Sequence, residues 1–410
     1  MQIVVQKFGG TSVQSVENRK NVINHIKAAL ADNNKVIVVV SALGRKPDPY
    51  ATDSLLDLVD YPENSNSERE IDLLVSCGET ISAVILSSEL QKQDVTSVAL
   101  TGAQAGFVTD DHFNNANILE VKPTRIMKEF ETSDVVVVAG YQGQTTSGEI
   151  TTIGRGGSDT SATSLGAAIQ AKRVEIFTDV SGIMTADPRV VKSARQLDVV
   201  TYDEICNLAN QGAKVVHPRA VEIAKQANIP IRVRSTNSTK MGTLITGSRT
   251  QATGKDIPKR LITGIAHVES ITQMKVKIVG DVQKHQSEVF RAMAQADIPV
   301  DFINISPTEV DYTIPDDLTN KATTILENLG HEYTIVKNCV KASAVGTGMT
   351  SVPDVASRVV QALTNNDVQI LQSADSHATI WVLIKKTDLI PAANALHDEF
   401  GLSKVQLAPV

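Results

Sequence analysis

Two short glycine-containing segments combine a basic side chain with backbone that a ligand can approach closely. The first is Lys7-Phe-Gly-Gly-Thr-Ser, which follows an apolar run at the N-terminus. Its adjacent glycines, Gly9 and Gly10, leave backbone N–H groups open to an anion, and Lys7 adds a positive charge. The same pattern is typical of a tight strand-to-helix turn with a surface lysine. The segment matches neither a Walker A loop nor a dinucleotide fingerprint.

The second segment, residues 151–162, carries a stronger signal. It places three glycines around Arg155 and puts Ser158 and Asp159 where an alanine-rich helix over 162–171 is expected to begin. A serine or aspartate there also serves as a helix cap, which accounts for one of the two. A cap accounts for neither the arginine nor the glycines. Because an arginine held against a glycine turn suits bidentate binding of a carboxylate or phosphate, this loop is predicted to bind an anion.

Three further segments carry weaker signals. Glu79 lies near the expected start of a helix, where an acidic side chain also simply complements the helix dipole. Residues 177–189 follow an apolar run with small and acidic side chains, which suits either a solvated loop or a loop beside a nucleotide. Lys214 lies in a glycine-containing turn, where most lysines are merely solvated. His217 and the other histidines show no metal-ligand spacing, and we assign them no chemistry.

Alternating apolar and amphipathic stretches predict the elements that position these segments. In the first 250 residues, short β-branched runs alternate with longer helix-like stretches. This pattern is typical of an open, mostly parallel α/β sheet with helices on both faces. The predicted strands are residues 3–6, 35–40, 95–100, 134–139, 174–178 and 231–235. The two glycine loops, with Lys7 and Arg155, are expected at strand ends of this sheet and indicate a phosphorylated ligand at its carboxyl edge.

The last 150 residues contain an internal repeat. Residues 235–259 are rich in Ser, Thr, Asn, Gly and Lys, which indicates a surface connection and a domain boundary near residue 250. Beyond it, residues 289–306 align without gaps on 359–376. Each copy is expected to run strand, helix, strand, strand, helix, the ferredoxin-like order, and the two units are expected to share a sheet or pack together. The predicted strands are 274–279, 311–314, 341–345 and 379–384, and the predicted later helices are 320–329 and 390–400.

Composition restricts the class of protein. The 410 residues carry a net charge of −7, which provides no basic field for nucleic acid or an anionic membrane. Apolar runs such as 36–40 and 135–139 fall far short of the roughly 20 residues that a membrane helix needs. We therefore expect a cytoplasmic protein.

Five segments, in this order along the chain, resemble the aspartokinases. They are residues 7–13, 76–82, 152–159, 177–189 and 212–215. The resemblance covers the whole chain and implies an amino-acid kinase domain over 1–250 followed by tandem ferredoxin-like βαββαβ ACT domains over 265–335 and 336–406. It also implies that a strand at 261–267 completes the second ACT domain. Residues 41–53 and 372–377 look closest to the monofunctional, diaminopimelate-sensitive type of spore-forming Gram-positive bacteria.

The resemblance implies ATP-dependent phosphorylation of the β-carboxylate of L-aspartate to 4-phospho-L-aspartate, the first step toward lysine, diaminopimelate, threonine and methionine. Magnesium is expected as MgATP, without an assigned side-chain ligand. The implied catalytic residues are Lys7, Arg155 and Asp159, and the implied substrate-binding residues are Thr52, Glu79, Arg155 and Ser158. The implied nucleotide-binding residues are Lys7, Gly9, Gly10, Ser41, Thr178, Asp179, Met184, Arg189, Lys214 and Val215.

The resemblance further implies feedback control by an amino acid and a homodimer or higher oligomer formed through the ACT domains. Meso-diaminopimelate is the favoured effector, with lysine and threonine as alternatives. ACT domains commonly show Asp-x-Pro-Gly before the first helix, but here Asp281 is followed by Val282-Gln-Lys, and Pro353 by Asp354. Two other functions remain open: a glutamate, acetylglutamate, carbamate or uridylate kinase of the same fold, and a non-catalytic ACT-type amino-acid sensor.

Overall fold

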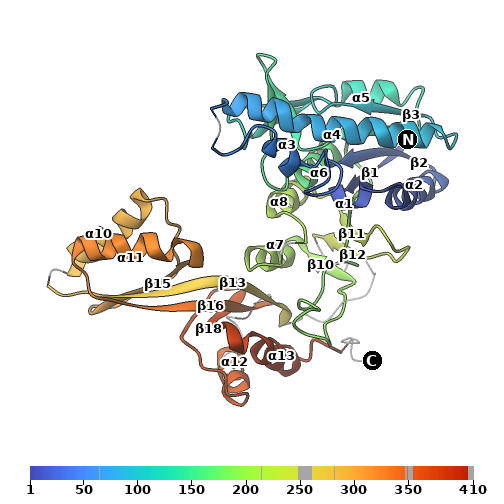
Figure 1. The fold of residues 1–410 in the computed structure, drawn as a ribbon. Helices are drawn as coiled ribbons and strands as arrows, with labels where there is room; N and C mark the ends of the chain where they lie inside the picture. Colours follow the sequence, from blue (N-terminus) through green and yellow to red (C-terminus); the bar gives the residue numbers. More distant parts are fainter. Residues whose placement is uncertain are drawn as a thin grey trace. The chain divides into compact units, whose positions relative to one another are not determined.

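The computed structural model describes residues 1–63, 65–213, 215–247, 261–280, 282–346, 349 and 354–404. The chain divides into two compact units (Figure 1). The first comprises Met1–Ile183, Gln196–Ala209 and Lys214–Ile257, and the second Met184–Arg195, Asn210–Ala213 and Pro258–Val410. Two short segments from the first 250 residues thus belong to the second unit, which the sequence did not indicate. The expected boundary near residue 250 lies outside the described residues.

A parallel sheet forms the centre of the first unit. Within the described residues it has eight strands in the order β10-β12-β11-β9-β1-β2-β6-β3, and all neighbours are parallel except β11 and β12. The strands are β1 (Gln2–Phe8), β2 (Asn34–Val40), β3 (Ser97–Leu100), β6 (Val135–Ala139), β9 (Arg173–Thr178), β10 (Val199–Thr201), β11 (Ile231–Ser235) and β12 (Thr243–Thr246). Each strand predicted for this half is present, which confirms the α/β fold class. Strand β12 was missed because its Ser/Thr-rich surroundings resemble a surface connection.

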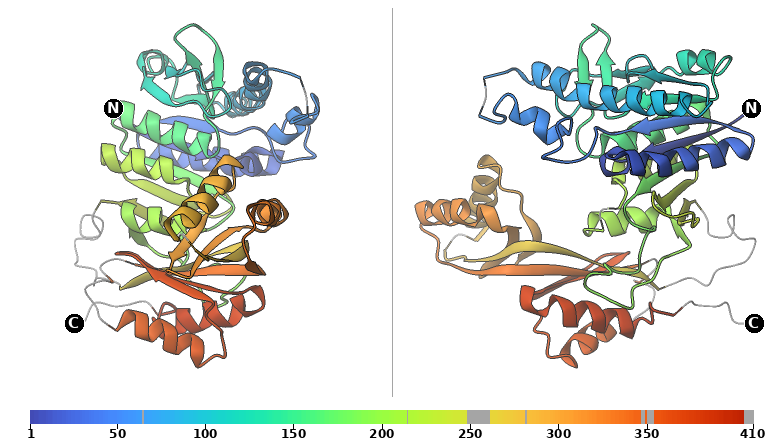
Figure 2. Two further views of the ribbon diagram at one scale, coloured as in Figure 1. Left: turned by 90° about the vertical axis from the view of Figure 1, so that its left-hand side faces the viewer. Right: turned by 45° about the vertical axis from the view of Figure 1, so that its right-hand side comes forward.

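Helices cover both faces of this sheet (Figure 2). Helices α2 (Val16–Ala31) and α4 (Glu68–Gln91) bury apolar side chains against one face, together with Val36, Val38 and Val40. Helix α6 (Gly157–Ile169) lies against β1 and β9 on the other face and packs on α8 (Pro218–Ala227). The other helices among the described residues of this unit are α1 (Gly10–Val13), α3 (Thr52–Asp57), α5 (Thr124–Glu129) and α7 (Tyr202–Asn210).

A smaller sheet, not predicted from the sequence, supports the second glycine loop. Its strands lie in the order β5-β4-β7-β8, with bounds β4 (Phe107–Thr109), β5 (Ile118–Val121), β7 (Gln142–Thr145) and β8 (Ile150–Thr152). These strands are only three or four residues long, so their sequences show little alternation. Because β8 ends at Thr152, this sheet delivers the glycine loop directly to the carboxyl edge of the main sheet.

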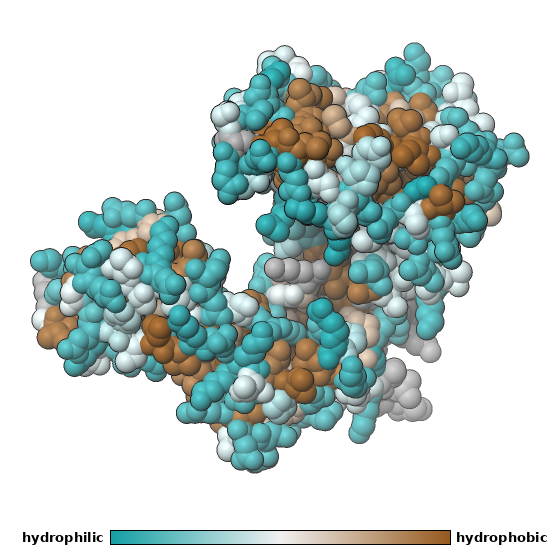
Figure 3. Space-filling view, in the orientation of Figure 1, coloured by the Kyte–Doolittle hydropathy of each residue, from teal (hydrophilic) through white to brown (hydrophobic). Residues whose placement is uncertain are grey.

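Helix α4 begins earlier than the sequence indicated. A capping box between Ser67 and Glu70 starts it, so Glu79 lies in the middle of the helix and does not complement its dipole. The helix is long and apolar enough to cross a membrane by length and composition, but 56% of its apolar window is buried inside the fold. Its exposed side chains include Leu73 and Val84, at 47% and 56%, and Figure 3 shows apolar surface over this helix. Its buried side joins the core, as expected for a core helix of a globular domain.

The two repeats of the second unit share one antiparallel sheet. Within the described residues it has six strands in the order β14-β15-β13-β16-β18-β17. The bounds are β13 (Ile262–Lys277), β14 (Asp301–Ile305), β15 (Glu309–Pro315), β16 (Tyr333–Gly346), β17 (Gln372–Asp375) and β18 (Thr379–Lys385). The segments expected as two strands, 261–267 and 274–279, form the single strand β13. Its pairing with β16 shifts register near Val268 and Ile271, where Ser270 has a φ of 60°.

Each repeat contributes one helix pair to this sheet. Helices α10 (Val282–Gln295) and α11 (Thr319–Leu329) pack on Met274, Val276 and Tyr312. Helices α12 (Val355–Thr364) and α13 (Leu389–Glu399) pack on a second cluster around Val340 and Ala342. Both views show the two pairs on opposite faces of the sheet (Figures 1 and 2).

Side-chain hydrogen bonds fix the two inserted segments within the second unit. Gln211 Oε1 accepts from Trp381 Nε1 at 2.6 Å and from Ser343 Oγ at 3.1 Å. Buried His397 joins Thr185 Oγ1 at 2.9 Å and Ser193 Oγ at 3.3 Å through its two ring nitrogens. The second unit therefore holds segments whose neighbours in sequence belong to the first unit.

Candidate active site

A cavity of about 490 Å³ lies at the carboxyl ends of the parallel strands of the first unit. Its lining includes Lys7 near the end of β1, Ser41 after β2, Tyr141 after β6, one side of α4 and the start of α6. Seven residues singled out from the sequence line it: Lys7, Ser41, Thr52, Glu79, Arg155, Ser158 and Asp159. The parallel sheet thus gathers residues that are up to 152 positions apart in the chain, from Lys7 to Asp159.

An ion pair joins the two glycine segments. Lys7 Nζ lies 2.7 Å from Asp159 Oδ1, and the side chains are only 14% and 12% exposed. Side chains alternate along β1, so Lys7 points to the same face as Val5, which is the face covered by α6. Both charges are therefore held at the cavity in a partly dehydrated environment, where electrostatic interactions are stronger than in water.

The two adjacent glycines of the first segment differ in their surroundings. A Cβ on Gly10 would lie 2.6 Å from Ala42 O and 2.7 Å from Gly44 O, so this glycine permits close packing of two loops. A Cβ on Gly9 would meet only Lys7 Nζ, at 3.6 Å. Gly9 therefore leaves space near the lysine, whereas Gly10 is required by packing.

The second glycine loop requires backbone conformations that favour glycine. Gly154 and Gly156 have φ values of 78° and 70°, and a Cβ on Gly156 would lie 2.2 Å from Cγ of His217. Gly156 is the N-cap of α6 and no side chain caps the helix, so the capping interpretation of Ser158 and Asp159 is wrong. The Arg155 side chain is exposed at the cavity, and among the described residues it forms no ion pair or hydrogen bond.

Glu79 is a buried acid at one wall of the cavity. Its Oε1 accepts a hydrogen bond from the Ala42 N–H at 3.1 Å, and its Oε2 has no hydrogen-bond partner among the described residues. Burial raises the pKa of this carboxyl to about 8, although backbone hydrogen bonds act in the opposite direction. Gly78 allows this part of α4 to approach the strand-end loop, because a Cβ there would lie 2.8 Å from that of Ala42.

Asp72 is a further acid of α4 that sequence reasoning missed. It is fully buried and accepts hydrogen bonds from the N–H groups of Asn114 and Thr152 and from the Thr152 hydroxyl. Burial raises its pKa, and these hydrogen bonds oppose the shift. Asp72 and Glu79 are seven residues apart, and residues at this spacing share one helix face. This spacing was the feature of the sequence that could have identified Asp72.

Asn114 and Tyr141 also line the cavity and were not singled out. Both have positive φ values, 64° and 68°, and follow no motif that local sequence reveals. Burial raises the pKa of the Tyr141 phenol. Ser158 accepts a hydrogen bond from Ser41 Oγ at 3.0 Å, which connects the loop after β2 to the start of α6.

The other residues expected at the nucleotide are placed outside the cavity lining or outside the described residues. Thr178 and Asp179 follow β9, and the Thr178 hydroxyl donates to Asp179 Oδ1 at 2.9 Å. Met184 and Arg189 belong to the second unit, where Arg189 pairs with Asp187 at 2.6 Å. Val215 is half-buried, and Lys214 lies outside the described residues.

Comparisons with known proteins agree with this architecture. Residues 2–235 match the amino acid kinase family, and residues 334–398 match an ACT domain. Over 404 residues the chain is 56% identical to Aspartokinase 1 of Bacillus subtilis (strain 168), covering 98% of this chain and 100% of that protein.

Solved structures show the same fold. The aspartate kinase of Clostridium acetobutylicum superposes with a TM-score of 0.81 at 24% identity, covering 97% of this chain and 100% of that one. E. coli aspartokinase III in complex with lysine and aspartate superposes with a TM-score of 0.77 at 25% identity, covering 97% and 99%.

Proposed function

The chain belongs to the aspartokinases, and from that premise we propose that the cavity transfers the γ-phosphoryl group of ATP to the β-carboxylate of L-aspartate, giving 4-phospho-L-aspartate. The observation that carries this proposal is the convergence of Lys7, Arg155 and Glu79 on one cavity at the carboxyl edge of the sheet. Together they offer one positive group for the transferring phosphoryl group and one group for each α-charge of a free amino acid.

The nucleophile needs no protein base. An aspartate β-carboxylate has an unperturbed pKa of about 3.9 and is ionised at neutral pH. Phosphoryl transfer then depends on alignment and on positive charge around a loose transition state. The absence of a catalytic histidine from the motifs is consistent with this chemistry.

Lys7 is the residue that we assign to the transferring phosphoryl group. Its ion pair with Asp159 keeps the ammonium at the end of β1 before ATP arrives. Gly9 leaves space beside that ammonium, so phosphate oxygens have room to approach. Asp159 acts as a positioning residue for the lysine and for the start of α6.

Arg155 and Glu79 are assigned to the α-carboxylate and the ammonium of aspartate, respectively. The guanidinium has five donors and no partner among the described residues, so it is available to a carboxylate. Glu79 Oε2 is buried without a hydrogen-bond partner among these residues, and a substrate ammonium would satisfy it. Thr52 and Ser158 line the same cavity and complete the proposed substrate site.

The nucleotide is proposed to extend from Lys7 along the loops after β2 and β9. The assigned residues are Gly9, Gly10, Ser41, Thr178, Asp179, Met184, Arg189, Lys214 and Val215. A kinase that uses ATP works with a divalent metal, which we propose to be Mg²⁺ carried by ATP. The oxygen donors of Ser41, Ser158 and Asp159 at the cavity fit a hard cation. When bound, this ion neutralises charge on the phosphates.

Regulation is proposed to act through the second unit. Residues 334–398 match an ACT domain, and the structure of E. coli aspartokinase III is a complex with lysine and aspartate. For this chain we favour meso-diaminopimelate as the effector, with lysine and threonine as alternatives, and a homodimer or higher oligomer formed through the ACT domains. We propose a cytoplasmic location, where ATP and aspartate are available.

The direct test is ATP-dependent formation of an acyl phosphate from L-aspartate, trapped with hydroxylamine. L-glutamate and N-acetyl-L-glutamate serve as alternative acceptors. Turnover restricted to aspartate supports the proposal, and turnover with another acceptor contradicts it. Repeating the assay with millimolar meso-diaminopimelate, lysine or threonine identifies the effector. Inhibition by none of them would contradict the regulatory assignment while leaving the kinase assignment intact.

A further inference from the structure

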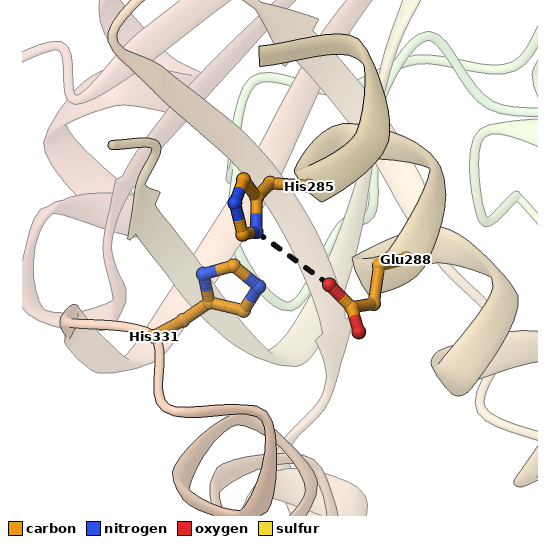
Figure 4. Close-up of side chains that lie close together, drawn as sticks. All are labelled: His285, Glu288 and His331. Carbon is orange, nitrogen blue, oxygen red and sulfur yellow. Dashed lines mark ion pairs between the residues drawn. The ribbon is translucent and has the colours of Figure 1, made fainter. Parts of the chain in front are cut away.

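Two histidines and a glutamate of the first repeat lie close together, far in sequence from every residue assigned to the kinase site. His285 and Glu288 belong to α10, and His331 follows α11 (Figure 4). Each residue offers one ligand atom, and these atoms all lie within 4.8 Å of one another. His285 Nδ1 lies 3.5 Å from Glu288 Oε2, and the two imidazole rings meet edge to face with centroids 5.2 Å apart.

The backbone holds these side chains in place. His285 and Glu288 are three residues apart and therefore share one face of α10. Gly330, with a φ of 75°, ends α11, and the N–H of His331 donates to Leu326 O at 3.1 Å. Helices α10 and α11 bury their apolar sides in the same cluster, so the histidine after α11 is fixed relative to the histidine on α10.

The hydrogen bonding of this cluster is incomplete. Nδ1 of His285 and Nε2 of His331 are buried and have no hydrogen-bond partner among the described residues. Neither the edge-to-face contact nor the 3.5 Å separation from Glu288 satisfies them, because a hydrogen bond to an imidazole nitrogen is shorter than this. Buried polar atoms without a hydrogen-bond partner in a folded protein indicate that a ligand, a water molecule or an ion binds there.

We propose that His285, Glu288 and His331 form a binding site for a divalent transition-metal ion of the Zn²⁺ type. Two imidazoles and one carboxylate are a donor set that zinc accepts, whereas Mg²⁺ prefers oxygen donors alone. Rotation of the side chains brings the three ligand atoms from their present spacing to within about 2.0–2.2 Å of one ion. The three residues belong to the second unit, and their donor set differs from the oxygen donors proposed for the metal carried by ATP.

The ion has a route from solvent and a free coordination position. The side chains of His285 and Glu288 are 31% and 40% exposed, so water can complete the coordination. Glu288 also borders a groove of about 380 Å³ along α10. Lys284 and Arg291 line that groove as well, and their positive charges limit the affinity of the site. A bound ion would join α10 to the end of α11 and stabilise the first repeat.

The test uses the full-length protein after treatment with EDTA, without ATP. Zn²⁺ is titrated in competition with a chromophoric chelator, and Co²⁺ is added separately to record its visible absorption bands. We expect one competing site per chain, tetrahedral-type Co²⁺ bands, and a rise in the melting temperature with Zn²⁺. His331→Gln and Glu288→Gln should each weaken binding at least about 10-fold and remove the bands.

His377→Gln is the matched control, because it removes an exposed histidine from the loop between β17 and β18. This variant should bind like the unsubstituted protein. Equal binding by the protein, by His331→Gln and by Glu288→Gln would overturn the proposal, as would the absence of any site. Since the Glu288 side chain is partly exposed, its variant is expected to fold, and far-UV circular dichroism verifies this for each protein.

Discussion

Lys7 Nζ and Asp159 Oδ1 lie 2.7 Å apart, joining the end of the central strand β1 to the first turn of α6. Each charge is mostly shielded from water by the fold. The pair therefore holds the lysine in position at the cavity, and removal of either partner leaves the other charge poorly compensated.

Lys7→Ala should lower kcat by about 10²- to 10³-fold, the usual effect of removing one group that stabilises transition-state charge. Acyl-phosphate trapping measures it. Lys35→Ala is the control, since Lys35 pairs with Asp134 at 2.8 Å on the surface. Near-normal kcat in Lys7→Ala would remove this lysine from the mechanism.

Arg155→Lys should raise KM for aspartate sharply and change KM for ATP much less. A lysine keeps the charge but loses the fork that binds a carboxylate through two hydrogen bonds. Steady-state kinetics with each substrate varied in turn measure both constants. Arg125→Lys, at a surface pair with Glu129, should change neither. Equal effects on both substrates would assign Arg155 to the phosphates instead.

Glu79 should make aspartate binding depend on pH. Burial raises its pKa to about 8, so the free enzyme holds this side chain protonated at neutral pH, and the protonated form attracts an ammonium poorly. KM for aspartate should therefore fall as the pH rises through about 8. In Glu79→Gln, KM for aspartate should be high and should not fall as the pH rises through about 8. The exposed Glu131→Gln serves as the control, and its KM should fall as in the unsubstituted protein.

The same group should affect stability. Its pKa rises from 4.5 in the unfolded chain to about 8 in the folded protein, so the folded state binds more protons between these values. The contribution of Glu79 to the free energy of unfolding is full below pH 4.5 and is lost as the pH rises toward 8. Urea unfolding of the protein and of Glu79→Gln at pH 5, 7 and 9 tests the sign. A difference that grows in favour of the unsubstituted protein at high pH contradicts it.

Comparing Gly9→Ala with Gly10→Ala should show which of the two glycines leaves space for the ligand and which is needed for packing. The Cβ of Gly10→Ala would overlap two backbone carbonyls, so this variant should lose about 1–3 kcal/mol of folding stability. The Cβ of Gly9→Ala meets only the lysine terminus, so this variant should remain stable and raise KM for ATP. Denaturant unfolding together with kinetics measures both. Equal stability losses would show that both glycines serve packing.

Gln211→Ala should weaken feedback inhibition while leaving kcat nearly unchanged. Its side chain accepts from Trp381 and Ser343 of the six-stranded sheet, three residues before Lys214 in the chain. Loss of these bonds frees the segment that connects the regulatory unit to the proposed nucleotide loop. Inhibition curves with the effector measure the change, and exposed Gln361→Ala is the control. An unchanged inhibition constant would exclude this connection.

Local sequence determined the parallel strands, the two glycine segments and the internal repeat. These features depend on residue types within a short stretch of sequence. Runs of β-branched residues form buried strands, and glycine occurs where the backbone has a positive φ or where another group approaches it closely. The position of Lys7 at the carboxyl edge was predictable, because it lies near the end of a parallel strand. Arg155 and Asp159 reach the same edge after β8 of the smaller sheet, which the sequence did not predict.

The other features of the fold and of the candidate site were decided only by the tertiary structure, since they depend on contacts between residues far apart in the sequence. Glu79 becomes a buried acid because α4 begins at Glu68 and packs along the sheet, which its neighbouring residues do not reveal. Asn114 reaches the cavity through a hydrogen bond to Asp72, 42 residues away. The single strand β13 and the segments 184–195 and 210–213 join the second unit through long-range pairing and burial. Side-chain periodicity specifies a buried face but not the partner that covers it.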